Sequence, residues 1–79
     1  MDNVEERLNK VIAEQLGIEE ADVITTANFE TDLSADDLDI TEIVISAERV
    51  FGITLDGDQV ENVKTVNDLL VLVREKSPK

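Results

Sequence analysis

The stretch from Asp32 to Phe51, DLSADDLDITEIVISAERVF, constrains the fold of this chain more than any other segment. Its apolar residues recur at spacings of three, four and seven, which is the period of one helix face. They are Ile40, Ile43, Val44, Ala47, Val50 and Phe51. We therefore predict an amphipathic helix that begins at Asp36 or Asp37, ends near Phe51 and has Gly52 as its stop.

The start of this helix carries an unusual number of carboxylates: Asp32, Asp36, Asp37, Asp39 and Glu42. Asp36 can cap the helix, and Asp39 lies three residues later, where a capping box needs it. The helix dipole stabilises acidic groups in the first turn by about 0.3–1 kcal/mol each, which accounts for one or two of them. Because like charges one turn apart repel, the excess indicates a contact surface. Simple solubility remains the alternative.

Two further long helices and a short one follow from the same kind of pattern. Residues 3–16 have helical spacing, with Asp2 or Asn3 as the N-cap and Gly17 as the left-handed stop. A short helix is predicted over about Gly57 to Asn62. A fourth helix is capped by Thr65, with Asp68 as the capping-box partner, and ends near Lys76.

Residues 17–35 form a long connection with little helical period. Loops of this length are uncommon in small domains, so apolar side chains must pin it against the helices. We predict that the pins are Ile18, Val23, Ile24, Phe29 and Leu33, with a single helical turn near Glu19–Val23. The expected fold is all-α: one domain over residues 1–79, a small four-helix bundle with three main helices and one short helix.

Composition excludes several functional classes. The chain has 79 residues and 7 basic against 19 acidic side chains, a formal net charge of −12. This charge argues against nucleic acid and anionic membranes and favours a partner with a basic surface. No cysteine or histidine is present, which excludes disulfides, zinc sites and histidine catalysis. The apolar run Leu69 to Val73 is too short to span a bilayer, and the N-terminus, MDNVEERL, is unlike a signal peptide, so we expect a cytoplasmic protein. We also expect a monomer.

Nothing in the sequence predicts an enzyme. The carboxylates lie at a polar helix start with no aromatic wall, so we expect ordinary solvated carboxylates there and not an acid–base pair. The aspartate spacing does not fit a calcium-binding EF-hand loop from either Asp32 or Asp56, so no metal site is predicted beyond weak, unspecific cation binding. Ser34 and Ser46 have no base nearby in the sequence.

The run from Leu33 to Asp39, LSADDLD, followed by Glu42, resembles the signature of acyl carrier proteins. That signature typically reads Leu-Gly-Ala-Asp-Ser-Leu-Asp, with a Glu at the same offset. The similarity extends over nearly the whole chain and includes Leu16-Gly17, Phe51-Gly52-Ile53 and the entry to the last helix at Thr65. It implies a carrier module of fatty-acid, lipid or polyketide assembly.

One departure concerns the chemistry of the family. The serine that takes the 4′-phosphopantetheine arm falls at Asp37, whose carboxylate cannot form the phosphodiester. Ser34 matches the family's glycine and is not a substitute. The resemblance therefore implies no cofactor on the chain as written, and an arm at position 37 only if that residue were Ser. Natural divergence and engineered replacement both remain possible origins of Asp37.

The resemblance also implies contacts for individual residues. Asp36, Asp39, Glu42 and Glu48 match acidic positions that meet basic patches on synthases and acyltransferases, and Ile45 matches an exposed apolar contact. The positions beside the acyl pocket are Ile43, Val44 and Ala47. For Ile43 and Val44, ordinary core packing is an equal alternative. A stand-alone acidic interaction or regulatory domain, unrelated to acyl transfer, is the competing function.

Overall fold

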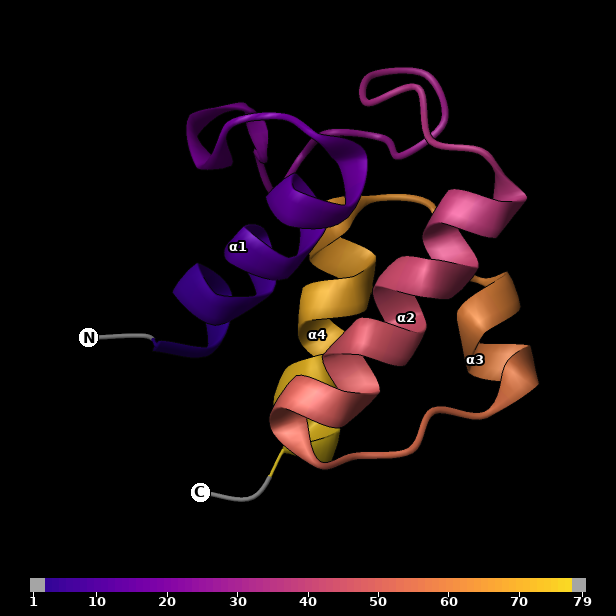
Figure 1. Ribbon diagram of the computed structural model, residues 1–79. Helices are drawn as coiled ribbons and strands as arrows, with labels where there is room; N and C mark the ends of the chain where they lie inside the picture. The colour runs from indigo at the N-terminus through magenta and orange to yellow at the C-terminus, as the bar shows by residue number, and fades with distance from the viewer. Residues whose placement is uncertain (1–2, 78–79) are drawn as a thin grey trace.

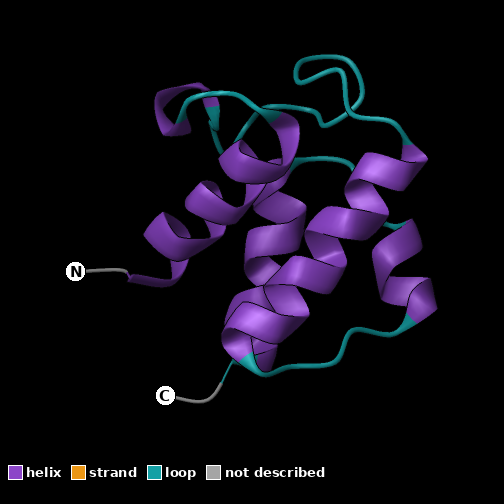
Figure 2. Ribbon diagram, viewed as in Figure 1, coloured by secondary structure: helices purple, strands orange, loops and turns teal. Residues whose placement is uncertain are grey.

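The computed structural model describes residues 3–77 and forms a bundle of helices (Figure 1). Within these residues the elements are α1 (Asn3–Leu16), the 3₁₀ helix η1 (Glu20–Asp22), α2 (Asp37–Phe51), α3 (Gly57–Glu61) and α4 (Val66–Lys76). Helix α1 packs against α2 and α4, and α3 lies beside α2 on the side away from α1 (Figure 1). Figure 2 shows only helices and loops in this part of the chain. The predicted all-α bundle is therefore confirmed.

An aliphatic core holds the helices together. The largest fully buried side chains are Leu8, Ile12, Phe29, Ile43, Val66, Leu69 and Val73. They come from α1, α2, α4 and the long loop, and no described polar or charged residue is buried with them. Burial of each such side chain stabilises the fold by about 1.5–3 kcal/mol relative to exposure. The bundle therefore depends on burying aliphatic surface, as the sparse aromatic content predicts.

The predicted stops of α1 and α2 are confirmed. Gly17 and Gly52 adopt left-handed conformations, with φ of 68° and 66°. The next residue in each case donates its N–H back into the helix, from Ile18 to the Ala13 carbonyl and from Ile53 to the Glu48 carbonyl, both at 3.0 Å. This geometry satisfies carbonyls that a helix end leaves free. The caps predicted at Asp2 and the Asn3 side chain lie outside the described residues.

The long loop from Gly17 to Asp36 is pinned mainly as predicted, with one error. Val23 and Phe29 are buried and Ile18 and Leu33 are half-buried, but Ile24 is 56% exposed. The loop turns at Ile24, whose carbonyl accepts the Ala27 N–H at 2.8 Å, and Ala27 takes the buried position instead. The predicted single turn is present as η1.

Backbone hydrogen bonds fasten this loop to the start of α4. Phe29 N–H donates to the Lys64 carbonyl at 2.9 Å, and Val66 N–H donates to the Ala27 carbonyl at 3.0 Å. Asn28 and Thr65 form an isolated antiparallel bridge between them. The end of the loop, and hence the start of α2, is thereby fixed against the bundle.

The structure corrects the sequence prediction at two further positions. Val50 was predicted on the buried face of α2 but is 42% exposed, because that face is centred on Ile43, Ala47 and Phe51. The Val50 carbonyl instead accepts a hydrogen bond from Arg7 Nη2 at 2.9 Å. Helix α3 ends at Glu61, one residue before the predicted end at Asn62, which is its C-cap.

Candidate functional site

The start of α2 is built by a capping box, as predicted. The Asp36 Oδ1 atom accepts the Asp39 N–H at 2.8 Å, and the Asp39 Oδ2 atom accepts the Asp36 N–H at 3.3 Å. The two carboxylates therefore satisfy backbone donors that the helix would otherwise leave free. Asp37 is the first residue of the helix, and its carboxylate takes no part in this box.

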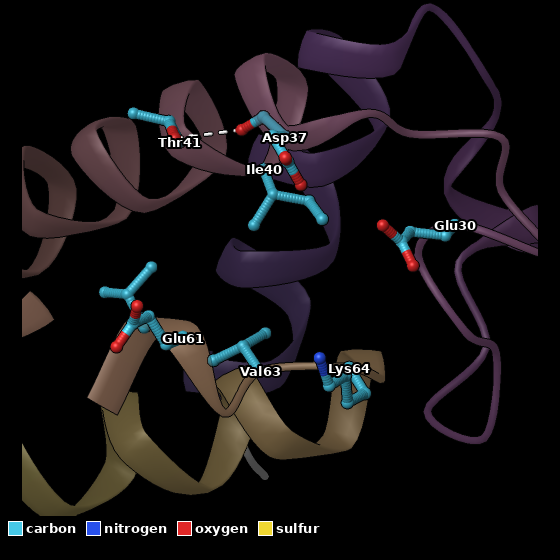
Figure 3. A pocket seen from close by; sticks show the side chains of 8 residues that line it. Glu30, Asp37, Ile40, Thr41, Glu61, Val63 and Lys64 are labelled. Atoms are coloured by element: carbon cyan, nitrogen blue, oxygen red, sulfur yellow. Dashed lines mark hydrogen bonds between the residues drawn. The ribbon is translucent and has the colours of Figure 1, made fainter. Parts of the chain in front are cut away.

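Asp37 is exposed and lies at the edge of a pocket of about 280 Å³ between α2 and the segment that joins α3 to α4. Figure 3 shows its carboxylate on the side of α2 that faces Glu30 and Lys64. The rim of the pocket is charged, whereas part of its wall is apolar. The apolar lining residues are Ile40, Val60 and Val63.

The hydroxyl nearest to Asp37 along the helix, that of Thr41, already forms a hydrogen bond with the backbone. Thr41 Oγ1 donates to the Asp37 backbone carbonyl at 2.9 Å (Figure 3). Ser34 is exposed in the loop and has a left-handed backbone, with φ of 56°. At position 37 itself the side chain offers a carboxylate and no hydroxyl, so this residue does not fit a phosphate-ester linkage.

The four acidic residues predicted to bind partners do not have equivalent surroundings. Asp36 and Asp39 share the capping box, and Glu42 is exposed, with Oε1 accepting a hydrogen bond from Gln15 Nε2 at 3.0 Å. Glu48 is half-buried, and its Oε2 accepts the Leu55 N–H at 2.8 Å. Glu48 therefore holds the segment after α2 in place, whereas Asp36, Asp39 and Glu42 lie together near the helix start.

The apolar residues predicted at the site separate into two groups. Ile45 is 44% exposed, whereas Ile43, Val44 and Ala47 are buried in the core. None of these three lies among the described residues that line the pocket beside Asp37. Ordinary core packing, the alternative considered for Ile43 and Val44, accounts for their positions in this structure.

Sequence reasoning missed three residues of this region. Leu38 is 65% exposed and lies on the same face of α2 as Glu42 and Ile45, at spacings of four and seven. Its spacing from the predicted contacts could have revealed it. Glu30 and Lys64 reach the pocket from the loop and from the α3–α4 connection, and no spacing in the sequence indicates that they meet there.

Other kinds of site find no support in the described residues. Between residues 3 and 77, His, Cys, Asp and Glu side chains nowhere gather in threes in a way that could hold a metal ion. In the same range, every helix is too short or too polar to cross a lipid bilayer.

Comparison with known proteins decides the family. Residues 6–73 match the family model described as a phosphopantetheine attachment site. The chain belongs to this family of carrier proteins. Carrier domains of this kind bear 4′-phosphopantetheine and interact with synthases and transferases, and they are not themselves catalysts.

A solved structure shows the same carrier fold. It is described as the solution structure of the apo doublet acyl carrier protein from prodigiosin biosynthesis, and it matches with a TM-score of 0.83 at 19% sequence identity. The match covers 98% of this chain but 37% of that protein. The predicted acyl-carrier-like bundle is thus confirmed at the level of fold.

Proposed function

We propose that this carrier domain docks on basic surfaces of the synthases and acyltransferases of fatty-acid, lipid or polyketide assembly, and does so without a prosthetic arm. The single observation that carries the proposal is the exposed carboxylate of Asp37 at the first position of α2, beside a pocket and next to further acidic residues. The arm requires a hydroxyl at that position, and aspartate has none.

The backbone at Ser34 supports this assignment of position 37. The resemblance to acyl carrier proteins aligns Ser34 with a glycine, and the φ of 56° at Ser34 is one that glycine adopts without strain. Counting three residues onward from this glycine-like position leads to Asp37 as the equivalent of the attachment serine. Ser34 itself occupies the loop position and is not the attachment residue.

Electrostatics support the docking partner. Asp36 caps α2, and Asp37, Asp39 and Glu42 lie within its first two turns, on a chain with a net charge of −12. Such a field accelerates association with a basic surface by about 10- to 1000-fold at low salt. The exposed Leu38 and Ile45 flank Glu42 and supply apolar contact area on the same face.

The first experiment tests the missing hydroxyl. Incubation with a phosphopantetheinyl transferase and coenzyme A, followed by intact-mass spectrometry, should leave this chain unchanged. The D37S variant should gain the mass of one phosphopantetheine arm. The doubly substituted chain D37S with Ser34→Ala should gain the same mass, because Ser34 is not the acceptor.

Two outcomes would contradict the proposal. A mass gain on the unmodified sequence would show that another residue accepts the arm. Failure of the D37S chain to react, with its helical circular dichroism intact, would favour the competing function, a stand-alone acidic interaction or regulatory domain. The carboxylate at position 37 is the observation that keeps this competing function open.

The second experiment tests docking through Glu42. In a titration with a carrier-protein synthase, E42K should weaken binding by about tenfold, because one charge contact is reversed at the proposed interface. Glu42 is chosen because its carboxylate is exposed, whereas charge reversal at Asp39 would also break the capping box.

The matched control is Glu75→Lys, an equal charge change at an exposed position in the last turn of α4. This variant should bind the synthase nearly as well as the unmodified chain. Equal weakening by both substitutions, or binding that does not respond to salt, would argue against a docking surface at the start of α2.

A further inference from the structure

A second hollow lies on the molecule between the end of α1, the long loop and the start of α2, with a volume of about 770 Å³. Its apolar lining comes from the end of α1 and from the loop. The large aliphatic residues are Leu16, Ile18, Ile24 and Leu33. Ile24, the residue that was predicted to be a buried pin, is 56% exposed here. We call this hollow the loop groove.

The charged residues of the loop groove are all acidic. Asp22, Asp32 and Asp39 line it, and no Lys or Arg is among its described lining residues. Their arrangement places negative charge around a partly apolar surface. A ligand that fits this groove must therefore combine an aliphatic group with positive charge.

The loop groove is held in shape by the fold. Asp32 Oδ2 accepts the Asn28 N–H at 2.7 Å, and backbone bonds fasten residues 25–29 to the start of α4. A preformed surface loses little conformational freedom when a partner binds. The exposed Ile24 side chain is thus presented on an ordered loop.

We propose that the loop groove binds a basic amphipathic helix of a partner protein. One aliphatic side chain of that helix lies against Ile24 and Leu33, and flanking Lys or Arg residues pair with Asp22 and Asp32. The groove lies beside the α2 surface, since Gln15 lines it and also donates to Glu42. The proposal goes beyond docking through α2 and does not depend on it.

The experiment uses the full chain labelled with ¹⁵N and a synthetic helical peptide with Leu on one face and Lys on the other. Two matched peptides separate the contributions: Ser replaces Leu in one, and Gln replaces Lys in the other. In NMR titrations near physiological salt, the Leu/Lys peptide should bind at least about tenfold more tightly than either control. The largest shift changes should fall on Ile18, Ile24 and Leu33.

The I24Q variant should weaken binding of the Leu/Lys peptide by about tenfold. Its matched control is Val71→Gln, which changes an aliphatic residue of α4 that is 43% exposed and does not line the groove. The control variant should bind like the unmodified chain. Asp22→Asn, which keeps the apolar surface, should weaken binding several-fold.

Three results would overturn the proposal. The first is that the peptide with Ser in place of Leu binds as tightly as the Leu/Lys peptide. The others are equal weakening by I24Q and Val71→Gln, or shift changes confined to α2. Self-association that I24Q abolishes would instead assign the groove to a second copy of the chain. None of these results bears on arm attachment at position 37, which the mass measurement reports separately.

Discussion

The side chain of residue 37 takes no part in the hydrogen bonds that cap α2, which explains why an aspartate is tolerated there. The capping bonds at the start of α2 come from Asp36 and Asp39, and only the backbone carbonyl of Asp37 bonds to Thr41. An aspartate in the first turn also complements the positive end of the helix dipole. The same helix therefore forms with either a carboxylate or a hydroxyl at this position.

Ser34 gives a stability prediction of its own. Its φ of 56° lies in the left-handed region, which costs an L-residue about 1–2 kcal/mol of stability. Glycine avoids this cost, but it makes the unfolded chain more flexible, which lowers stability by about 0.4–1 kcal/mol. Ser34→Gly should therefore raise the free energy of unfolding by about 0.5–1 kcal/mol, as measured by urea denaturation.

The control for this prediction is Ser46→Gly inside α2, which should destabilise the chain by about 0.5–1 kcal/mol. If Ser34→Gly were as destabilising as Ser46→Gly, the left-handed strain at position 34 would not be the cause.

Among the elements, α4 shows most clearly how local chemistry fixes a helix start. The N–H groups of Lys64 and Thr65 donate to Asp68 Oδ2, both at 3.0 Å, and Asp68 N–H donates to Thr65 Oγ1 at 3.2 Å. The Lys64 bond, followed by the Thr65 bond, holds the pKa of the Asp68 carboxyl below its ordinary value of about 3.8. The fold therefore stabilises the charged form of this group.

A lowered pKa has a definite sign in the dependence of stability on pH. The contribution of Asp68 is fully present above its unfolded pKa and is lost as the pH falls through the lower folded pKa. Asp68→Asn should therefore destabilise the chain at neutral pH, and the difference from the unmodified chain should shrink as the pH falls below about 4. Urea denaturation across this pH range measures the difference.

Glu75→Gln serves as the comparison, because it removes the same charge from an exposed position of α4. The same urea series on Glu75→Gln gives the baseline against which the loss for Asp68→Asn below about pH 4 is read. A difference for Asp68→Asn that stayed constant with pH would mean that the hydrogen bonds act equally on both protonation states.

The helices were predictable because their signals are local. Helical spacing, the capping boxes at Asp36 and Thr65, and the glycine stops all act within a few residues of one another. Ile24 and Val50 were mispredicted because spacing alone does not say which of two neighbouring apolar residues is buried. Ala27 is buried in place of Ile24, and Phe51 in place of Val50.

The candidate site was predictable only along α2. Asp36 caps that helix and Asp39, Glu42 and Ile45 lie on it, so the resemblance to the carrier family predicts them as contacts. Glu30 and Lys64 reach the pocket through backbone bonds between the loop and the α4 entry, which no sequence spacing encodes. The structural bond of Glu48 to Leu55 is likewise a product of the tertiary fold.

For the molecule as a whole, the net charge of −12 opposes compaction. Among residues 3–77, a surface ion pair joins Arg74 Nη2 to Glu5 Oε1 at 3.5 Å. Because salt screens repulsion over a Debye length of about 10 Å at 0.1 M, added sodium chloride should raise the melting temperature of the chain. Thermal unfolding followed by circular dichroism at low and moderate salt measures this shift.

The role of charge repulsion can also be tested by removing negative charges from the chain. Replacing the exposed Glu6 and Glu75 by Gln makes the net charge less negative and should reduce the salt dependence of the melting temperature. A melting temperature that falls with salt would mean that attractive pairs outweigh repulsion across the surface.

The capping box at the start of α2 has a consequence for how this protein could change its role. Asp36 and Asp39, on either side of position 37, form the capping box, so a swap at that one side chain leaves the helix start intact. Under the proposed function, loading and recognition would be separable traits: a single replacement would decide whether the domain competes as an empty decoy or delivers a tethered cargo.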